Sequence, residues 1–171
     1  MKKSLLFLFL LVLGVTQGWA YDELTSAVTV TEDKVYQVTS TRTINGTISV
    51  NPGNTLTIYI AKGKTLTVRG TNGSARTTPG KPAIEVPVKT INGETLKATL
   101  IITGGGTLRA YGGKANGYTN YNGGSGAAPA IGGIGGNGGE ANIGNVNVRP
   151  GNPGESMGDV FIRGNVTVRV A

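Results

Sequence analysis

The chain has 171 residues, which is enough for one domain of ordinary size. It contains 29 glycines, more than twice the usual share of ~7%, and neither cysteine nor histidine. These two absences exclude disulfide scaffolds, thiol nucleophiles, Cys/His zinc sites and Ser-His-Asp triads. The formal net charge of +7 is compatible with anionic glycans or surfaces as partners, and equally with solubility alone.

The first twenty residues have the pattern of a secretory signal peptide. A basic start at Met1–Lys3 precedes the apolar run Leu5–Val15, and Gly18 and Ala20 place small residues at the −3 and −1 positions of a cleavage site. The apolar run is short for a membrane span of ~20 residues, so cleavage is favoured over a membrane anchor. We therefore predict a signal peptide over 1–20 and one mature domain over 21–171. The mature protein is then extracellular, at the cell surface or in the periplasm, without a membrane span.

The rest of the chain alternates short segments rich in Val, Ile and Thr with turn clusters, which predicts an all-β domain. No stretch shows the 3.6-residue apolar spacing of a helix. The glycine-rich span Gly104–Gly158 is compatible with a disordered linker, but the isoleucines at 131, 134 and 143 favour a tightly turning wall, in which glycine permits positive φ or close backbone approach. The predicted strands are Ala27–Thr31, Val35–Thr39, Thr43–Val50, Thr55–Ala61, Thr65–Gly70, Ala83–Val86, Lys97–Thr103, Thr107–Tyr111, Asn145–Arg149, Asp159–Arg163 and Asn165–Val170.

An internal repeat predicts how these strands stack. The paired segments are Thr57–Ile60 with Thr65–Gly70, their copies 42 residues later at Thr99–Ile102 and Thr107–Gly112, and a third copy at Asp159–Gly164 with Val166–Arg169. The first two units continue through a polar, glycine-rich excursion to Pro-Ala-Ile, at Pro82–Ile84 and Pro129–Ile131. Strand pairs and long loops in a fixed order are typical of a parallel β-solenoid, whose coils bury side chains by stacking. We predict a short right-handed parallel β-helix of about three to four coils; a β-sandwich is the alternative.

The glycine-rich segments carry a resemblance to known proteins. Gly105–Gly113, Ala130–Gly133, Gly138-Gly139 and Val146–Val148 resemble the glycine-rich units of secreted bacterial surface proteins. This resemblance covers about 45 residues, 104–148. The mature chain also resembles, more generally, carbohydrate-binding right-handed parallel β-helix proteins related in fold to pectate lyases. The resemblance implies an extracellular solenoid with a role in glycan binding or adhesion.

The carboxylates form no pattern typical of catalysis. Asp22-Glu23 and Glu32-Asp33 are adjacent pairs, and adjacent residues on a strand point to opposite faces. A glycosidase needs two carboxylates facing one sugar, and nothing in the sequence selects Glu85 and Glu140 for this role. We predict a protein without catalytic activity, cofactor or metal, and a divergent lyase is the alternative. Because the basic residues are scattered singly, no nucleic-acid partner is predicted.

The candidate carbohydrate-binding residues lie on the second strand of each unit and in one loop. Leu66, Val68, Leu108, Ala110, Val166 and Val168 alternate inward, which leaves Thr67, Arg109 and Thr167 in one outer column and Arg69, Tyr111 and Arg169 in the next. Arginine binds carboxylates bidentately, and tyrosine rings can stack on sugars. Tyr118 and Tyr121 lie in the longer excursion. The predicted site residues are Arg69, Arg109, Tyr111, Tyr118, Tyr121 and Arg169; a merely solvated face and loop anchoring are the alternatives.

Two further surfaces indicate partners. On the first strand of each unit, Tyr59, Ile101 and Phe161 are expected to form an outward apolar ladder, covered by loops, by the N-terminal strands or by another protein. The segment Asn165–Ala171 is expected to expose Val166, Val168 and Val170 and unpaired backbone groups. Truncation of the chain, capping by the N-terminal strands and assembly are three explanations, and we predict self-association through this segment.

Together, these patterns predict a secreted, non-catalytic bacterial surface protein that binds polysaccharide, anionic glycans in particular, through an outward strand face. The alternative is a structural or adhesive surface protein that binds a protein partner or associates with itself.

Overall fold

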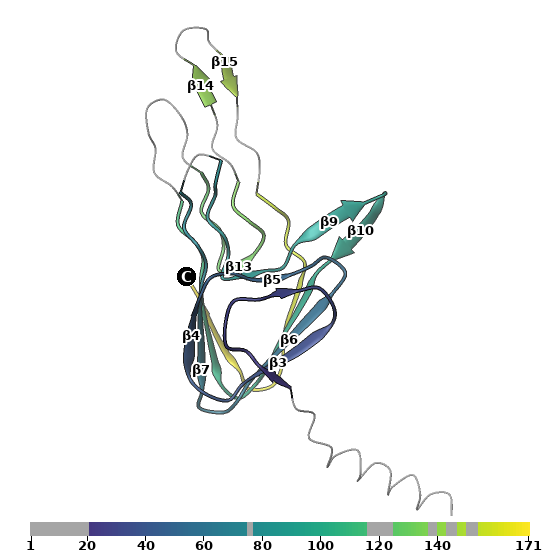
Figure 1. Ribbon diagram of the computed structural model, residues 1–171, viewed down its shortest axis with the longest axis vertical. Coiled ribbons are helices and arrows are strands. Elements are labelled where there is room, and N and C mark those ends of the chain that lie inside the picture. Colours follow the sequence, from purple (N-terminus) through teal and green to yellow (C-terminus); the bar gives the residue numbers. More distant parts are fainter. Residues whose placement is uncertain (1–20, 75–76, 116–124, 137–139, 143–146, 150–153) are drawn as a thin grey trace, which may run out of the picture.

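The computed structural model describes residues 21–74, 77–115, 125–136, 140–142, 147–149 and 154–171 (Figure 1). These residues are all-β: the described part of the chain contains no helix, and most of its strands pair in parallel. The all-β prediction is therefore confirmed. The predicted signal peptide lies outside the described residues.

Three parallel sheets contain most of the strands, and they form three sides around a common interior (Figure 1). Sheet A consists of β1 (Asp22–Glu23), β3 (Lys34–Val38), β6 (Thr55–Ile60), β11 (Thr99–Gly104) and β16 (Asp159–Ile162). Sheet C consists of β4 (Arg42–Asn45), β7 (Thr65–Arg69), β12 (Thr107–Tyr111) and β17 (Thr167–Val170). Sheet B consists of β2 (Thr29–Val30), β5 (Ile48–Val50), β8 (Ile84–Glu85) and β13 (Ile131–Gly132).

The chain visits the sheets in the order A, C, B, and we call each such circuit a pass. The three complete passes are β3–β4–β5, β6–β7–β8 and β11–β12–β13. An incomplete pass before them contributes β1 and β2, and an incomplete pass after them contributes β16 and β17. Two antiparallel hairpins lie outside the three sheets: β9 (Val88–Ile91) with β10 (Glu94–Lys97), and β14 (Glu140–Asn142) with β15 (Asn147–Arg149).

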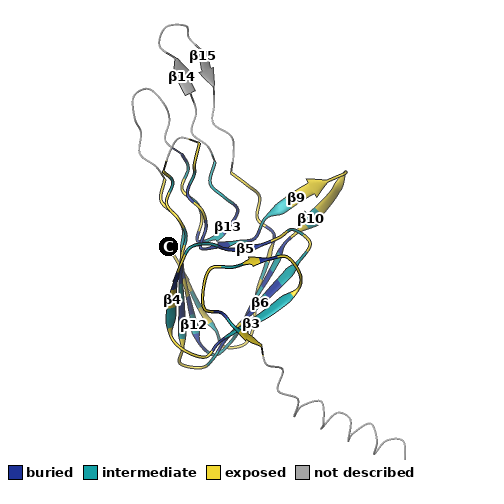
Figure 2. Ribbon diagram, in the orientation of Figure 1, coloured by how far each residue is buried: buried dark blue, intermediate teal, exposed yellow. Residues whose placement is uncertain are grey.

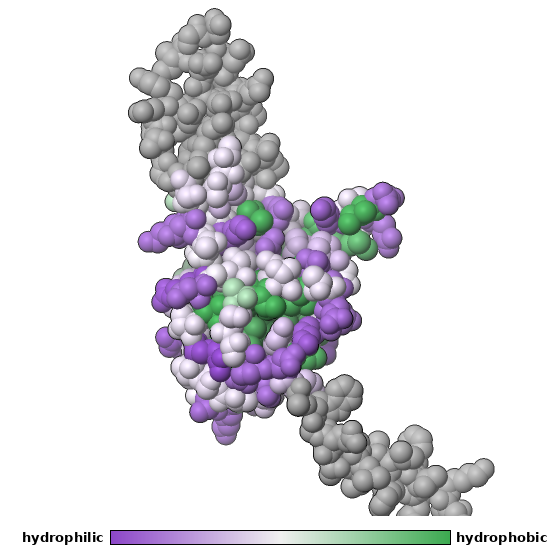
Figure 3. Space-filling view, viewed as in Figure 1, coloured by the Kyte–Doolittle hydropathy of each residue, from purple (hydrophilic) through white to green (hydrophobic). Residues whose placement is uncertain are grey.

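The core is built from apolar residues that alternate along the strands and stack between passes. Leu56 lies beside Leu100 in sheet A, and Ile48 lies beside Ile84 in sheet B. All four side chains are fully buried. Because successive side chains on a strand point to opposite faces, one buried set fixes the register of the whole pass. Figure 2 shows buried residues along the three sheets and exposed residues on the β9–β10 hairpin. Figure 3 shows one face of the molecule, on which exposed hydrophobic residues at the centre are surrounded by mainly hydrophilic residues.

The predicted offset of 42 residues is confirmed in sheet C. Leu66 pairs with Leu108, Val68 with Ala110, and all four are fully buried. The Pro-Ala-Ile repeat is also confirmed, because Ile84 pairs with Ile131 in sheet B.

The same offset is wrong in sheet A, where Thr99 pairs with Thr55 instead of Thr57. The reason is the corner between sheets A and C: residues 61–64 connect β6 to β7, whereas only 105–106 connect β11 to β12. The predicted outer ladder is therefore shifted. Ile101 lies between Thr57 and Phe161, and Tyr59 lies beside Thr103.

The register predicted for the third copy is also wrong by two residues. Leu108 pairs with Val168 rather than Val166, and Arg109 pairs with Arg169 rather than Thr167. Because a shift of two residues preserves the face, Arg169 still points outward, but in the column of Arg109.

Two glycine turns account for two further differences from the predicted strands. The predicted strand Thr43–Val50 is divided into β4 and β5 by Gly46, which has a φ of +130° at the corner. The β9–β10 hairpin, which the sequence reading missed, turns at Asn92 and Gly93, with φ values of 52° and 83°. Positive φ at both central residues of an Asn-Gly pair is typical of a type I′ hairpin.

The excursions between sheets C and B, together with two segments of the connection from β13 in sheet B to β16 in sheet A, form a glycine bundle. We define it as the six segments 70–74, 77–83, 112–115, 125–130, 132–136 and 154–158. Segment 77–83 alone is hydrogen-bonded to four others. Lys81 N donates to Thr71 O, Gly113 N to Lys81 O, Gly80 N to Gly126 O, and Gly135 N to Gly80 O, at 2.8–3.2 Å. A strand in a flat sheet has two neighbours, so these segments pack in three dimensions.

Glycine is required in this bundle because backbone packs directly against backbone. A Cβ atom on Gly80 would lie 2.5 Å from the Gly113 carbonyl oxygen, and one on Gly113 would overlap that of Thr71. No φ in the left-handed region is needed at either position. Close backbone approach, the second reason predicted for the glycines, thus accounts for both.

We predict that Gly113→Ala destabilises the protein by about 1–3 kcal/mol, the range for overpacking of an interior. The added methyl group would displace two backbone segments. Thermal unfolding followed by circular dichroism measures the effect, at about 2–4 °C per kcal/mol for a chain of this size. Gly105→Ala is the matched control, because its nearest neighbour is a side-chain atom, Lys62 Cβ at 3.3 Å. Equal melting temperatures for the two variants would contradict this packing.

Candidate functional site

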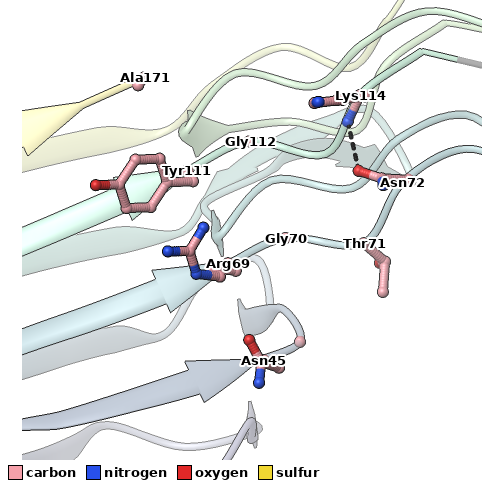
Figure 4. A pocket seen from close by; sticks show the side chains of 10 residues that line it. Asn45, Arg69, Gly70, Thr71, Asn72, Tyr111, Gly112, Lys114 and Ala171 are labelled. Carbon is pink, nitrogen blue, oxygen red and sulfur yellow. Dashed lines mark hydrogen bonds between the residues drawn. The ribbon is translucent and has the colours of Figure 1, made fainter.

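An open cleft of about 640 Å³ lies where the strands of sheet C enter the glycine bundle. Its lining comes from the ends of β4, β7 and β12, from the segments that follow them, and from Ala171, which follows β17 (Figure 4). The side chains that give it polar and aromatic character are Asn45, Arg69, Asn72, Tyr111 and Lys114.

Arg69 and Tyr111 form the centre of this cleft. They are register partners on neighbouring strands of sheet C, and their side chains point to the outer face because Val68 and Ala110 point inward. The Arg69 guanidinium carbon lies 4.7 Å from the centre of the Tyr111 ring, within the range of a cation–π contact. Figure 4 shows the guanidinium beside the ring. The prediction that these two residues share an outer column is confirmed.

Asn72 and Lys114 join the two glycine-bundle segments that border the cleft. Lys114 N donates to Asn72 Oδ1 at 2.9 Å, and Gly73 N donates to Lys114 O at 2.9 Å. Lys114 follows Gly113, which allows its segment to approach Thr71 closely, whereas Gly112 packs against Ala128 and Pro129. The pairing holds an exposed Lys114 beside the cleft.

A pair of cations lies on the same face of sheet C, two residues before Tyr111 along β12. Arg109 and Arg169 are exposed register partners on β12 and β17. Like charges that lie opposite each other on neighbouring strands are unfavourable. The described salt bridges lie elsewhere and join Lys34 to Asp22, Arg42 to Glu23, and Lys97 to Asp159. Within the described residues, no carboxylate forms a salt bridge with Arg69, Arg109, Lys114 or Arg169.

The six predicted site residues are thus divided. Arg69 and Tyr111 lie in the cleft, and Arg109 and Arg169 form a separate pair on the same sheet face. Tyr118 and Tyr121 lie outside the described residues. Sequence reasoning missed Asn45, Asn72 and Lys114; the signal available for them was their position just after, or at the end of, a strand that precedes a glycine-rich loop.

Acidic groups lie away from the cleft in the described part of the chain. Glu85 is on sheet B, where its carboxylate accepts a 2.6 Å hydrogen bond from Ser49 Oγ. Asp22 forms a hydrogen bond with Lys34, and this bond and the charge of Asp22 raise the pKa of that lysine. Among the described residues, no three His, Cys, Asp or Glu side chains gather as metal ligands would. The described segments also contain no helix with the length and apolarity to span a membrane.

Comparisons with protein families, curated proteins and solved structures find no match to this chain.

We predict that Asn72→Ala loosens the segment that carries Lys114. A hydrogen bond of this kind stabilises by ~1 kcal/mol, so the Lys114 amide should exchange with solvent about fivefold faster. Hydrogen exchange followed by NMR measures the rate. Asn45→Ala is the control, because Asn45 lines the same cleft without forming this bond. An unchanged rate at Lys114 in Asn72→Ala would show that Asn72 does not hold the segment.

Proposed function

We propose that the protein is a secreted, non-catalytic parallel β-solenoid that binds anionic polysaccharide through the outer face of sheet C and the adjoining cleft.

The solenoid assignment is supported by the order of the passes. Sheets A, C and B are visited in the same order in each complete pass, and each of the three sheets pairs equivalent strands in parallel. A β-sandwich uses antiparallel sheets, whereas antiparallel ladders occur here, in the described chain, only in two hairpins outside the three sheets. A right-handed path follows the general rule for connections between parallel strands.

The observation that carries the proposed function is the cleft itself, in which Arg69 stacks on Tyr111 beside Lys114. No Asp or Glu side chain is among the lining residues, so a carboxylate or sulfate on a ligand would meet the cationic groups of Arg69 and Lys114 in this cleft. Arginine presents paired donors to such groups, and the ring offers an apolar surface to sugar C–H groups. Arg109 and Arg169 extend the positive surface along sheet C.

We propose that the protein binds the polysaccharide without cleaving it. Glycoside hydrolysis needs two carboxylates on one sugar, and no Asp or Glu side chain lines this cleft. The signal-peptide pattern and the resemblance to glycine-rich bacterial surface proteins support an extracellular or cell-surface location. An anionic cell-wall or capsular polysaccharide is a ligand of suitable chemistry for that location.

A second candidate function is adhesion to a protein, and the outer face of sheet A favours it. Tyr59 is 42% exposed and Phe161 is 46% exposed on that face. Exposed aromatic side chains are enriched at protein interfaces. A Tyr59→Ala variant that loses surface attachment but retains polysaccharide binding would favour adhesion.

We predict that the protein binds polygalacturonate and that Arg69→Ala weakens this binding at least about tenfold. The variant would lose the charge-assisted pair between Arg69 and a ligand carboxylate, and Tyr111 would lose its cation–π contact with Arg69. Isothermal titration calorimetry at two salt concentrations measures the effect. Higher salt should also weaken wild-type binding, since exposed charges are screened over about 8–10 Å.

Lys89→Ala is the matched control, because it removes one positive charge from the β9–β10 hairpin, away from the cleft. An uncharged polysaccharide of similar length serves as the second ligand. Equal losses in Arg69→Ala and Lys89→Ala would indicate only a net-charge effect and would contradict the proposed site. Failure of wild-type protein to bind any acidic polysaccharide would contradict the function.

A further inference from the structure

Two arginines lie side by side on the outer face of sheet C. Arg109 on β12 and Arg169 on β17 are register partners, and neighbouring strands of a sheet are only about 4.8 Å apart. Both side chains are exposed. Because like charges that lie opposite each other repel, this pair lowers the stability of the protein unless an anion binds beside it.

The fold itself does not require arginine at these two positions. The same outward column continues through Thr67 on β7 and Thr43 on β4, and threonine is well suited to strands. The first two complete passes thus fill the column with a short neutral side chain, whereas β12 and β17 fill it with a cation. Residues that oppose local stability in this way are expected at functional sites.

The described part of the chain offers no partner for either guanidinium. Its salt bridges and its cation–π contacts all involve other cations. Across β12, Arg109 has Thr67 on one side and Arg169 on the other. The donors of the two guanidinium groups are therefore accessible to a ligand on this face.

The geometry of the pair favours one class of anion. A carboxylate has two oxygens in one plane and pairs with a single guanidinium through two parallel hydrogen bonds. A sulfate or phosphate ester has three terminal oxygens that point in different directions, so it can accept hydrogen bonds from two guanidinium groups at once. Thr107 and Thr167, which are register partners two residues earlier on the same face, add two hydroxyl groups.

The arginine pair adjoins the cleft along these same strands. Tyr111 follows Arg109 by two residues on β12, and Ala171, which follows Arg169 by two residues, also lines the cleft. Two residues of a strand span about 6.6 Å. Successive sugars of one polysaccharide can therefore contact the Tyr111 ring and the arginine pair together.

We propose that the polysaccharide carries sulfate or phosphate esters, and that Arg109 and Arg169 bind one such ester between them. This inference rests on the proposed function and narrows its ligand from any anionic polysaccharide to one that bears tetrahedral oxyanions. A polymer that carries only carboxylates, such as polygalacturonate, uses mainly the cleft and binds more weakly.

Charged derivatives of one neutral backbone test this preference. Carboxymethyl dextran, dextran sulfate and dextran phosphate are prepared with equal charge per chain, so that they differ in the anion alone. In isothermal titration calorimetry, one of the two esters should bind wild-type protein at least about tenfold more tightly than carboxymethyl dextran, because a second charge-assisted contact is gained. The tighter of the two esters identifies the natural substituent as sulfate or phosphate.

Two variants test the residues. Arg109→Thr and Arg169→Thr each introduce the residue that β7 has at the equivalent position. Each should melt at no lower a temperature than wild type, because a like-charge pair is relieved, and each should bind esters and carboxymethyl dextran equally. Lys89→Thr is the matched control, because it removes one positive charge from β9 and should retain the preference.

The possible outcomes separate this inference from the proposed function. Equal binding of the three derivatives by wild-type protein, or a preference that persists in both arginine variants, would overturn the arginine subsite and leave the proposed function standing. Loss of the preference in Lys89→Thr as well would indicate a net-charge effect and would also overturn the subsite. Failure of wild-type protein to bind any of the derivatives or polygalacturonate would overturn the proposed function and this inference with it.

Discussion

Parallel backbone pairing between successive passes is the constraint on which the rest of this structure depends. Each pass must place its inward residues on those of the previous pass, as Leu66, Leu108 and Val168 do in sheet C. The residues between them are then forced outward in columns. Arg69 and Tyr111 meet for this reason: they occupy equivalent outward positions on neighbouring strands, and no contact between them is needed to establish the fold.

The glycine bundle borders this surface and, with it, forms the candidate cleft. The excursions leave sheet C directly after β7 and β12, and their backbones pack so closely that side chains are excluded at Gly80 and Gly113. The bundle therefore forms a wall beside the strand ends without filling the space above Tyr111. Asn72 and Lys114, which belong to this wall, face the same cleft as the strand residues. The glycines of the bundle therefore help to place Asn72 and Lys114 beside the cleft, in addition to allowing the backbone segments to pack.

The sequence was sufficient to predict features that depend on local alternation and repetition. The repeat predicts which residues of sheet C point inward and that Ile84 pairs with Ile131. It also predicts that Arg69 and Tyr111 are neighbours on the outer face. It was insufficient where corner length differs between passes, because two residues fewer at 105–106 shift sheet A without changing which face is buried. The third copy was misaligned for a similar reason: Val166 and Val168 are both apolar and share a face, so alternation alone does not select one. Asn72 and Lys114 were missed because their roles depend on contacts between loops far apart in sequence.

We propose that an anionic polysaccharide binds in the cleft lined by Arg69, Tyr111 and Lys114. An NMR titration of the ¹⁵N-labelled protein with galacturonate oligomers tests this most directly, because it locates the ligand without any mutation. We expect the largest amide shifts at Arg69–Asn72 and Tyr111–Lys114, with smaller shifts at Arg109 and Arg169. Shifts confined to the outer face of sheet A, around Tyr59 and Phe161, would contradict it.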